Sequence, residues 1–235
     1  MTPALALLFA VAAAFPPGQP AAGYVTDVVP HADGTLHLQT SAYLPREGDI
    51  VIFSYKDSLR AVMYALAGTG EFYHSGVVVR LPNGELATLE AGAVDGYDVF
   101  LLTLPTRLPA YQGNVWVRRL RTPLTAAESA ELTDFAVRQT GKGFAFHRVL
   151  QAVSPFRPRG WLGVKLWGKT DLERSSWFCS ELVVAALVAA GRMDADEVAA
   201  NGVYPEDLFN DEVVNLQAGW EMPLLWSQTQ RFSSQ

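Results

Sequence analysis

Hydrophobic residues in the first half of the chain gather in short runs that favour β-strands. Ile50 to Phe53 is β-branched and aromatic, and Asn114 to Leu120 has a similar character. The apolar run Ser75 to Val79 is separated from Leu86 to Glu90 by Pro82-Asn83-Gly84, a strong turn signal. The pattern therefore predicts several short strands, of which 75–79 and 86–90 form an antiparallel hairpin.

Other parts of the first half carry weaker signals. Residues 23–46 show no clear period and are expected to be irregular, as is the proline-punctuated loop over 92–113. Asp57 is a candidate cap for a short helix that runs to Leu66 and ends before two glycines.

The second half of the chain has helical spacing. Thr125-Ala126-Ala127-Glu128 fits a capping box, and it predicts a helix to about Thr140, before Gly141. Apolar residues then recur at helical spacing between Ser176 and Ala190, with Ser175 or Ser176 as the cap and Gly191 as the end.

A last short helix is expected from Pro205. Strands grouped first and helices grouped later predict an α+β fold, which we expect to form one domain over residues 23–235.

The N-terminus has a separate character. Residues 4–15 are unbroken apolar sequence and are followed by a turn-rich stretch, which is typical of a secretory signal peptide over residues 1–22. An uncleaved N-terminal anchor or a misplaced start codon are the alternatives. A secretory signal peptide predicts an exported protein, periplasmic or extracellular.

Composition narrows the class of protein. The hydrophobic set makes up 49% of the residues and charged residues 18%, which excludes wholesale disorder. Past residue 15 no apolar run is long enough to span a bilayer, which excludes a polytopic membrane protein. The formal net charge of −6 argues against a nucleic-acid partner.

The chain contains one cysteine, Cys179. A single thiol forms no intramolecular disulfide and excludes cysteine-based zinc or iron–sulfur sites, so it is either a buried hydrophobe or a reactive group. Cys179 falls at the expected start of a helix, where unpaired N–H groups and the helix dipole favour a thiolate. The same position supplies a backbone N–H for an oxyanion.

A catalytic thiolate needs a base, which is most often histidine. His31 and His37 lie in the irregular N-terminal stretch, and His147 lies in an aromatic patch where a packed or surface role is favoured. His74 precedes the 75–79 strand, and the hairpin places it near Glu90 at the end of the returning strand. A carboxylate there can orient an imidazole, although a strand-end surface charge is the alternative.

Three segments together resemble a known family. They are Gly48 to Phe53, then Tyr73 to Val79 with Leu89-Glu90-Ala91 after the hairpin, and then Trp177 to Val183. In the order His, Glu, Cys, they are similar to the circularly permuted branch of the NlpC-type papain-like cysteine hydrolases, the YiiX-like group. The resemblance covers most of residues 46–210.

The resemblance implies a circularly permuted papain-like α+β fold, in which the helix that carries the cysteine packs against an antiparallel sheet. It implies Cys179 as nucleophile, His74 as base and then acid, and Glu90 as the residue that orients His74, with no cofactor and no metal. Tyr73 and Ser75, which flank His74, are candidate substrate-binding residues.

Residues 141–176 carry a further signal. They hold seven Lys and Arg residues against two acidic ones, together with several large apolar side chains. We expect a lid or wall of the cleft, with Arg157 and Trp161 as candidate substrate-binding residues, or a contact with a membrane surface. The alternative is a solvated loop whose tryptophans pack on the core.

The leading hypothesis is an exported thiol hydrolase, an amidase or peptidase, that acts on peptides such as those of the cell wall or on another acyl amide or ester. A lipid-directed amidase, thioesterase or acyltransferase of the same fold is the first alternative. A non-catalytic binding module is the second.

Overall fold

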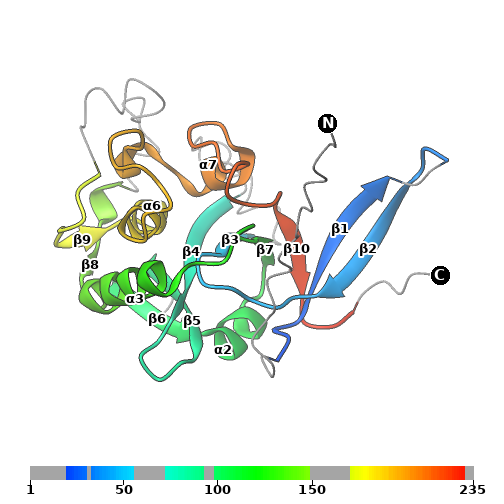
Figure 1. The fold of residues 1–235 in the computed structure, drawn as a ribbon, viewed down its shortest axis with the longest axis horizontal. Coiled ribbons are helices and arrows are strands. Elements are labelled where there is room, and N and C mark those ends of the chain that lie inside the picture. The colour runs from blue at the N-terminus through cyan, green and yellow to red at the C-terminus, as the bar shows by residue number, and fades with distance from the viewer. Residues whose placement is uncertain (1–19, 31–32, 56–71, 93–97, 149–169, 231–235) are drawn as a thin grey trace, which may run out of the picture.

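A ten-stranded sheet runs through the residues that the computed structural model describes, which are 20–30, 33–55, 72–92, 98–148 and 170–230 (Figure 1). The strand order is β2-β1-β10-β7-β3-β4-β5-β6-β8-β9. Neighbouring strands are antiparallel, except for the parallel pair at the β8–β9 end. Together with its helices, the sheet confirms the expected mixed α+β class.

The described strands, in chain order, are β1 (Tyr24–Pro30), β2 (Leu36–Ala42), β3 (Ile50–Ser54), β4 (Phe72–Arg80), β5 (Leu86–Gly92), β6 (Asp98–Thr103), β7 (Asn114–Arg118), β8 (Gly143–Phe144), β9 (Ser176–Trp177) and β10 (Leu224–Ser227). The described helices are α2 (Leu104–Ala110), α3 (Ala126–Gln139), α6 (Cys179–Ala189), the 3-10 turn η1 (Ala200–Gly202) and α7 (Pro205–Asn210). None of them has the length and apolar character that a membrane crossing requires.

The strands expected from apolar runs are confirmed as β3, β4, β5 and β7. β4 and β5 pair as the predicted hairpin, with Gly76 opposite Glu90. Gly84 closes the turn with φ +87°, a conformation that favours glycine, and the Leu81 N–H donates to the Glu85 carbonyl at 2.8 Å. The hairpin therefore forms where the local turn chemistry indicates.

The expectation of irregular structure over 23–46 is wrong. β1 and β2 form a hairpin that projects from the body of the molecule in Figure 1, and β1 also pairs with β10. Val28, Leu36 and Leu38 are exposed, and most β2 side chains face solvent. These strands are held by backbone pairing more than by a buried face, so they lack the alternation that marks a strand in the sequence.

The expected loop over 92–113 is also wrong in its described part. β6 pairs along the length of β5, and α2 follows it immediately. Pro105 lies in the first turn of α2, where a missing N–H costs nothing, and Pro109 lies in its last turn. Pro105 is thus compatible with a helix although it indicated a loop, whereas Pro109 lies inside the helix and removes one of its backbone hydrogen bonds.

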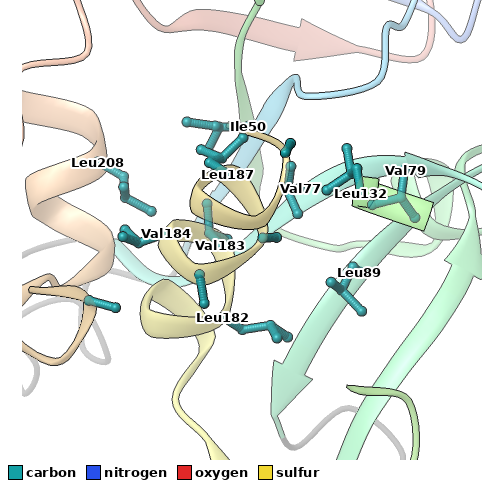
Figure 2. Close-up of a cluster of buried hydrophobic side chains, with 14 of the residues drawn as sticks. Ile50, Val77, Val79, Leu89, Leu132, Leu182, Val183, Val184, Leu187 and Leu208 are labelled. Carbon is teal, nitrogen blue, oxygen red and sulfur yellow. The ribbon is translucent and has the colours of Figure 1, made fainter. Parts of the chain in front are cut away.

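Alternating residues of the central strands face two separate cores. Ile50, Ile52, Val77 and Val79 pack with α3 and α6, whereas the residues between them belong to a second core. Figure 2 shows the first core, in which Leu182, Val183 and Leu187 of α6 lie beside the strands. The second core contains Val51, Phe53 and Val78, together with Leu104 and Leu108 of α2.

The predicted helices that fall within the described residues are confirmed, with one changed cap. At α3 the Thr125 N–H donates to Glu128 Oε2 at 2.6 Å, and the Glu128 N–H donates to Thr125 Oγ1 at 3.3 Å, which completes the capping box. α7 starts at Pro205 as expected.

The cap predicted for α6 at Ser175 or Ser176 is wrong, because Ser176 pairs with β8 and the helix begins at Cys179. Glu181 takes the capping role, since its Oε2 accepts from the Phe178 N–H at 3.4 Å. The helix ends before Gly191, which has φ +69°.

Some sequence predictions lie outside the described residues. They are the short helix over 57–66, the candidate residues Arg157 and Trp161, and residues 1–19 of the expected signal peptide.

Candidate active site

His74 and Glu90 meet through the pairing of β4 with β5. Gly76 lies directly opposite Glu90, so His74, two residues earlier on the same face of β4, lies diagonally across from the carboxylate. His74 Nε2 and Glu90 Oε2 are 2.7 Å apart. Both side chains are buried, and the contact is a charge-assisted hydrogen bond whenever the imidazole is protonated.

Two glycines make room for this pair. A Cβ on Gly76 would lie 2.7 Å from Glu90 Cγ, which is closer than such atoms approach. A Cβ on Gly92 would lie 3.3 Å from His74 Cε1 and 3.5 Å from Nδ1, and 3.8 Å from Phe144 Cε2. The bare backbone at Gly92 therefore leaves space at the Nδ1 edge of the imidazole, next to β8.

Cys179 approaches His74 from the start of α6. Its side chain is 1% exposed and packs with Ala145, Phe178 and Tyr204 in a small cluster that Phe144 of β8 flanks. The thiol lies close enough to His74 to raise the pKa of the imidazole. Because Nε2 is engaged by Glu90, Nδ1 is the ring nitrogen left for the sulfur.

The electrostatics of the pair favour a charged imidazole and a charged carboxylate. Burial disfavours the imidazolium, but Cys179 and then Glu90 outweigh burial through hydrogen bonds and charge, and they raise the pKa of His74 from 6.5 to about 9. Burial also opposes ionisation of Glu90, yet His74 and Arg107 lower the pKa of this carboxyl to about 2. Glu90 is therefore an acceptor for the Nε2–H of His74.

Glu90 has two more partners that the sequence reasoning missed. Thr88 Oγ1 donates to Glu90 Oε1 at 2.5 Å. Arg107 of α2 donates from Nε to Oε1 at 2.8 Å and from Nη2 to Oε2 at 2.8 Å. A signal for Arg107 was present, because Leu104, Arg107 and Leu108 have the i, i+3, i+4 spacing of one helix face.

The other two described candidates are placed differently. Ser75 is fully buried and, by strand alternation, faces away from His74 toward the α6 side. Tyr73 is half-buried, and its hydroxyl is hydrogen-bonded to that of Tyr111. The structure thus brings His74, Glu90 and Cys179 together, without Ser75.

Two basic residues of the 141–176 segment lie at the start of the cysteine helix. Arg148 Nε is 2.7 Å from Glu181 Oε1, and Arg174 Nη1 is 3.3 Å from Oε2. Glu181 is 1% exposed. These two positive charges therefore share one buried carboxylate of α6.

No group of three His, Cys, Asp or Glu side chains suited to hold a metal ion occurs in the described part of the chain. A cavity of about 870 Å³ lies beside α2, lined by Leu86, Leu104, Pro109 and Trp226 among others. His74, Glu90 and Cys179 do not line it, so the site rests on their mutual geometry and not on that cavity.

Comparison with known proteins gives structural likenesses only. No family model matches the chain, and no curated protein matches it. The structure is similar to the crystal structure of the metalloprotein YiiX from Escherichia coli O157:H7, with a TM-score of 0.43 and 19% sequence identity. The match covers 79% of this chain and 91% of that one.

Proposed function

We propose that this chain is a thiol-dependent hydrolase of amide or ester bonds, with a circularly permuted papain-like fold. Cys179 is the nucleophile, His74 the base and then acid, and Glu90 the residue that orients His74. The observation that carries the proposal is the placement of Cys179 beside His74, whose Nε2 is 2.7 Å from the ionised Glu90.

The first half-reaction makes a thioester. The Cys179 thiolate attacks the carbonyl carbon of the substrate, and the resulting oxyanion accepts hydrogen bonds from backbone N–H groups at the start of α6, which have no intrahelical acceptor. The imidazolium of His74 gives its Nδ1 proton to the leaving nitrogen or oxygen. The bond from the carbonyl carbon to the leaving group then breaks, which leaves the acyl group on sulfur.

The second half-reaction regenerates the thiolate. Neutral His74 accepts a proton from water, whose oxygen attacks the thioester carbon. The carbon–sulfur bond breaks, the acid leaves, and the thiolate and the imidazolium are restored together. Through both steps Glu90 keeps the Nε2–H of His74 directed at itself, so that Nδ1 remains the nitrogen that exchanges protons.

Access to the sulfur requires movement of its neighbours. Cys179 is 1% exposed and lies in the cluster with Ala145, Phe178 and Tyr204. A substrate carbonyl reaches the sulfur when part of this cover shifts. Between turnovers the closed cover excludes water from the thiolate.

Peptides, such as those of cell walls, are the proposed substrates of an exported chain. The lipid-directed alternative rests on the apolar and basic character of residues 141–176. In the described part of that segment, Arg148 and Arg174 contact Glu181, and Lys142 lies 3.7 Å from Glu173, so the choice between peptide and lipid is left to the assay.

The test compares wild type with Cys179→Ala on murein peptides and on phospholipid vesicles. We expect the wild type to release peptide fragments, the Cys179→Ala variant to release none, and neither to consume lipid. Gly202→Ala is a matched control, because a Cβ there meets nothing within 4 Å, and it should retain wild-type activity.

Three outcomes decide against parts of the proposal. Fragment release by Cys179→Ala at the wild-type rate would refute the thiol mechanism. Consumption of phospholipid by the wild type alone would replace the peptide substrate with a lipid one. Binding of murein without turnover by either protein would support a non-catalytic module.

A further inference from the structure

We propose that Arg107 is a positioning residue of this site, which fixes the Glu90 carboxylate in the orientation that holds His74 and offsets the charge of that carboxylate. The inference rests on the proposed function, and it assigns a role to a residue of α2 outside the cysteine–histidine–glutamate set.

Arg107 holds Glu90 with a two-pronged contact. Its Nε is 2.8 Å from Oε1 and 3.0 Å from Oε2, and its Nη2 is 2.8 Å from Oε2. Arg107 is 4% exposed and Glu90 is fully buried. The planar guanidinium therefore sets the plane of the carboxylate, which a point charge such as lysine does not do.

The contact reaches His74 through one shared oxygen. Glu90 Oε2 accepts from Arg107 Nη2 and is also the atom 2.7 Å from His74 Nε2. Phe53 supports both basic groups, because the Arg107 guanidinium lies 4.5 Å from its ring centroid and the His74 ring lies 5.3 Å from it. A change in the Arg107 side chain thus acts on the oxygen and the ring that orient the imidazole.

The positive charge of Arg107 also affects how tightly His74 holds its proton. The titratable and charged groups that face this region come from four elements. They are Cys179 of α6, Glu90 of β5, Tyr73 of β4, Arg107 of α2 and Tyr111, which directly follows α2. Burial raises the pKa of both phenols, so neither carries charge at neutral pH. Arg107 is then the second cation beside Glu90, next to the His74 imidazolium, and without it the carboxylate would hold the proton of His74 more tightly.

The experiment follows the titration of His74 by NMR, through its Cε1–H signal, in wild type and Arg107→Met. We expect the His74 titration to move upward by about one pH unit in Arg107→Met. Arg107→Lys keeps the charge and should return the titration close to wild type. In the hydrolysis assay this lysine variant should still lose kcat, with KM little changed, because the two-pronged contact is absent.

Arg118→Met is the matched control. Arg118 is also a buried arginine paired with a carboxylate, at 2.7 Å from Asp211 Oδ1, and that pair lies outside the contacts of His74. This variant should lose stability and leave the His74 titration unmoved. If Arg107→Met does not fold, Arg107→Gln keeps a donor without the charge and carries the same expected shift.

Two results would overturn the inference. One is a His74 titration that stays at the wild-type value in Arg107→Met or Arg107→Gln, and the other is an equal shift in Arg118→Met. The titration needs no substrate, so its outcome is separate from the proposed function. A wild type without hydrolytic activity would refute that function and still leave the effect of Arg107 on His74 measured.

Discussion

His74 is a residue at which two partners outweigh burial. A buried imidazole without partners titrates below its ordinary pKa, because the low dielectric disfavours its charged form. Here Cys179 and Glu90 reverse that tendency, and the pKa of His74 rises to about 9. At neutral pH the side chain therefore holds the proton that the proposed acylation step delivers to the leaving group.

This charge state predicts the alkaline limb of the pH profile. We expect kcat/KM for peptide hydrolysis to fall as the pH rises through about 9, since His74 then loses the proton that it donates. In Glu90→Gln the negative charge is absent, so the limb should move down toward the ordinary histidine value of about 6.5. The measurement is kcat/KM from pH 5 to 11 (roughly the range in which histidine and thiol groups titrate) for both proteins. A limb at the same pH in both would contradict the coupling of Glu90 to His74.

The register of β4 against β5 is the element-scale feature on which the site depends. Placing Gly76 opposite Glu90 gives the carboxylate the space that a side chain would occupy. We expect Gly76→Ala to force Glu90 away from His74, because the new Cβ would lie 2.7 Å from Glu90 Cγ and 3.0 Å from the Leu89 carbonyl oxygen.

The expected cost of Gly76→Ala is about 1–3 kcal/mol in the free energy of unfolding, together with loss of most hydrolytic activity. Urea unfolding and the peptide assay measure the two effects. Gly202→Ala meets nothing within 4 Å and should change neither. Wild-type activity in Gly76→Ala would show that the close approach of this strand to Glu90 is not required.

Elements whose signal is local are predictable from the sequence. The β4–β5 hairpin follows from its turn residues, and the α3 cap follows from Thr125 and Glu128. β1 and β2 were missed because their stability comes from pairing with each other and with β10, which leaves no alternating pattern. Tertiary pairing also explains why Ser176 joins a strand instead of capping α6.

The candidate site was predictable in part for the same reason. His74 and Glu90 were placed together by a short hairpin, which fixes their separation from local sequence alone. Arg107 reaches Glu90 only through the packing of α2 on the sheet, and its prolines made that helix resemble a loop. The expected roles of Tyr73, Arg157 and Trp161 in substrate binding stay predictions.

At the scale of the whole molecule, buried charges occur in matched groups. Glu90 is paired with Arg107, Glu181 with Arg148 and Arg174, and Arg118 with Asp211. Asp49 is an exception, because its oxygens accept from the Tyr43 hydroxyl and from the N–H groups of Arg46 and Leu120 instead of from an opposite charge. Burial therefore dominates there and raises the pKa of Asp49 from 3.8 to about 7.

These two kinds of carboxylate predict opposite effects of pH on stability. The pKa of Glu90 is about 2 in the folded chain and ordinarily 4.5. Between these values the unfolded chain binds more protons, so stability rises with pH, by about 3 kcal/mol. For Asp49 the folded chain binds more protons between pH 3.8 and about 7, so stability falls with rising pH in that window.

The sum of the two effects places maximal stability in mild acid, at roughly pH 4–5, below the usual range of globular domains. Urea unfolding from pH 2 to 8 (roughly the span of these titrations) in wild type, Glu90→Gln and Asp49→Asn separates them. Glu90→Gln should flatten the rise on the acid side, and Asp49→Asn should flatten the decline toward neutral pH. Each variant also loses hydrogen bonds and is less stable throughout, so the decisive quantity is the slope against pH and not the free energy at one pH. If the slope between pH 4 and 7 is the same in Asp49→Asn as in wild type, the Asp49 carboxyl is already ionised in the folded chain, and its three donors outweigh the cost of burial.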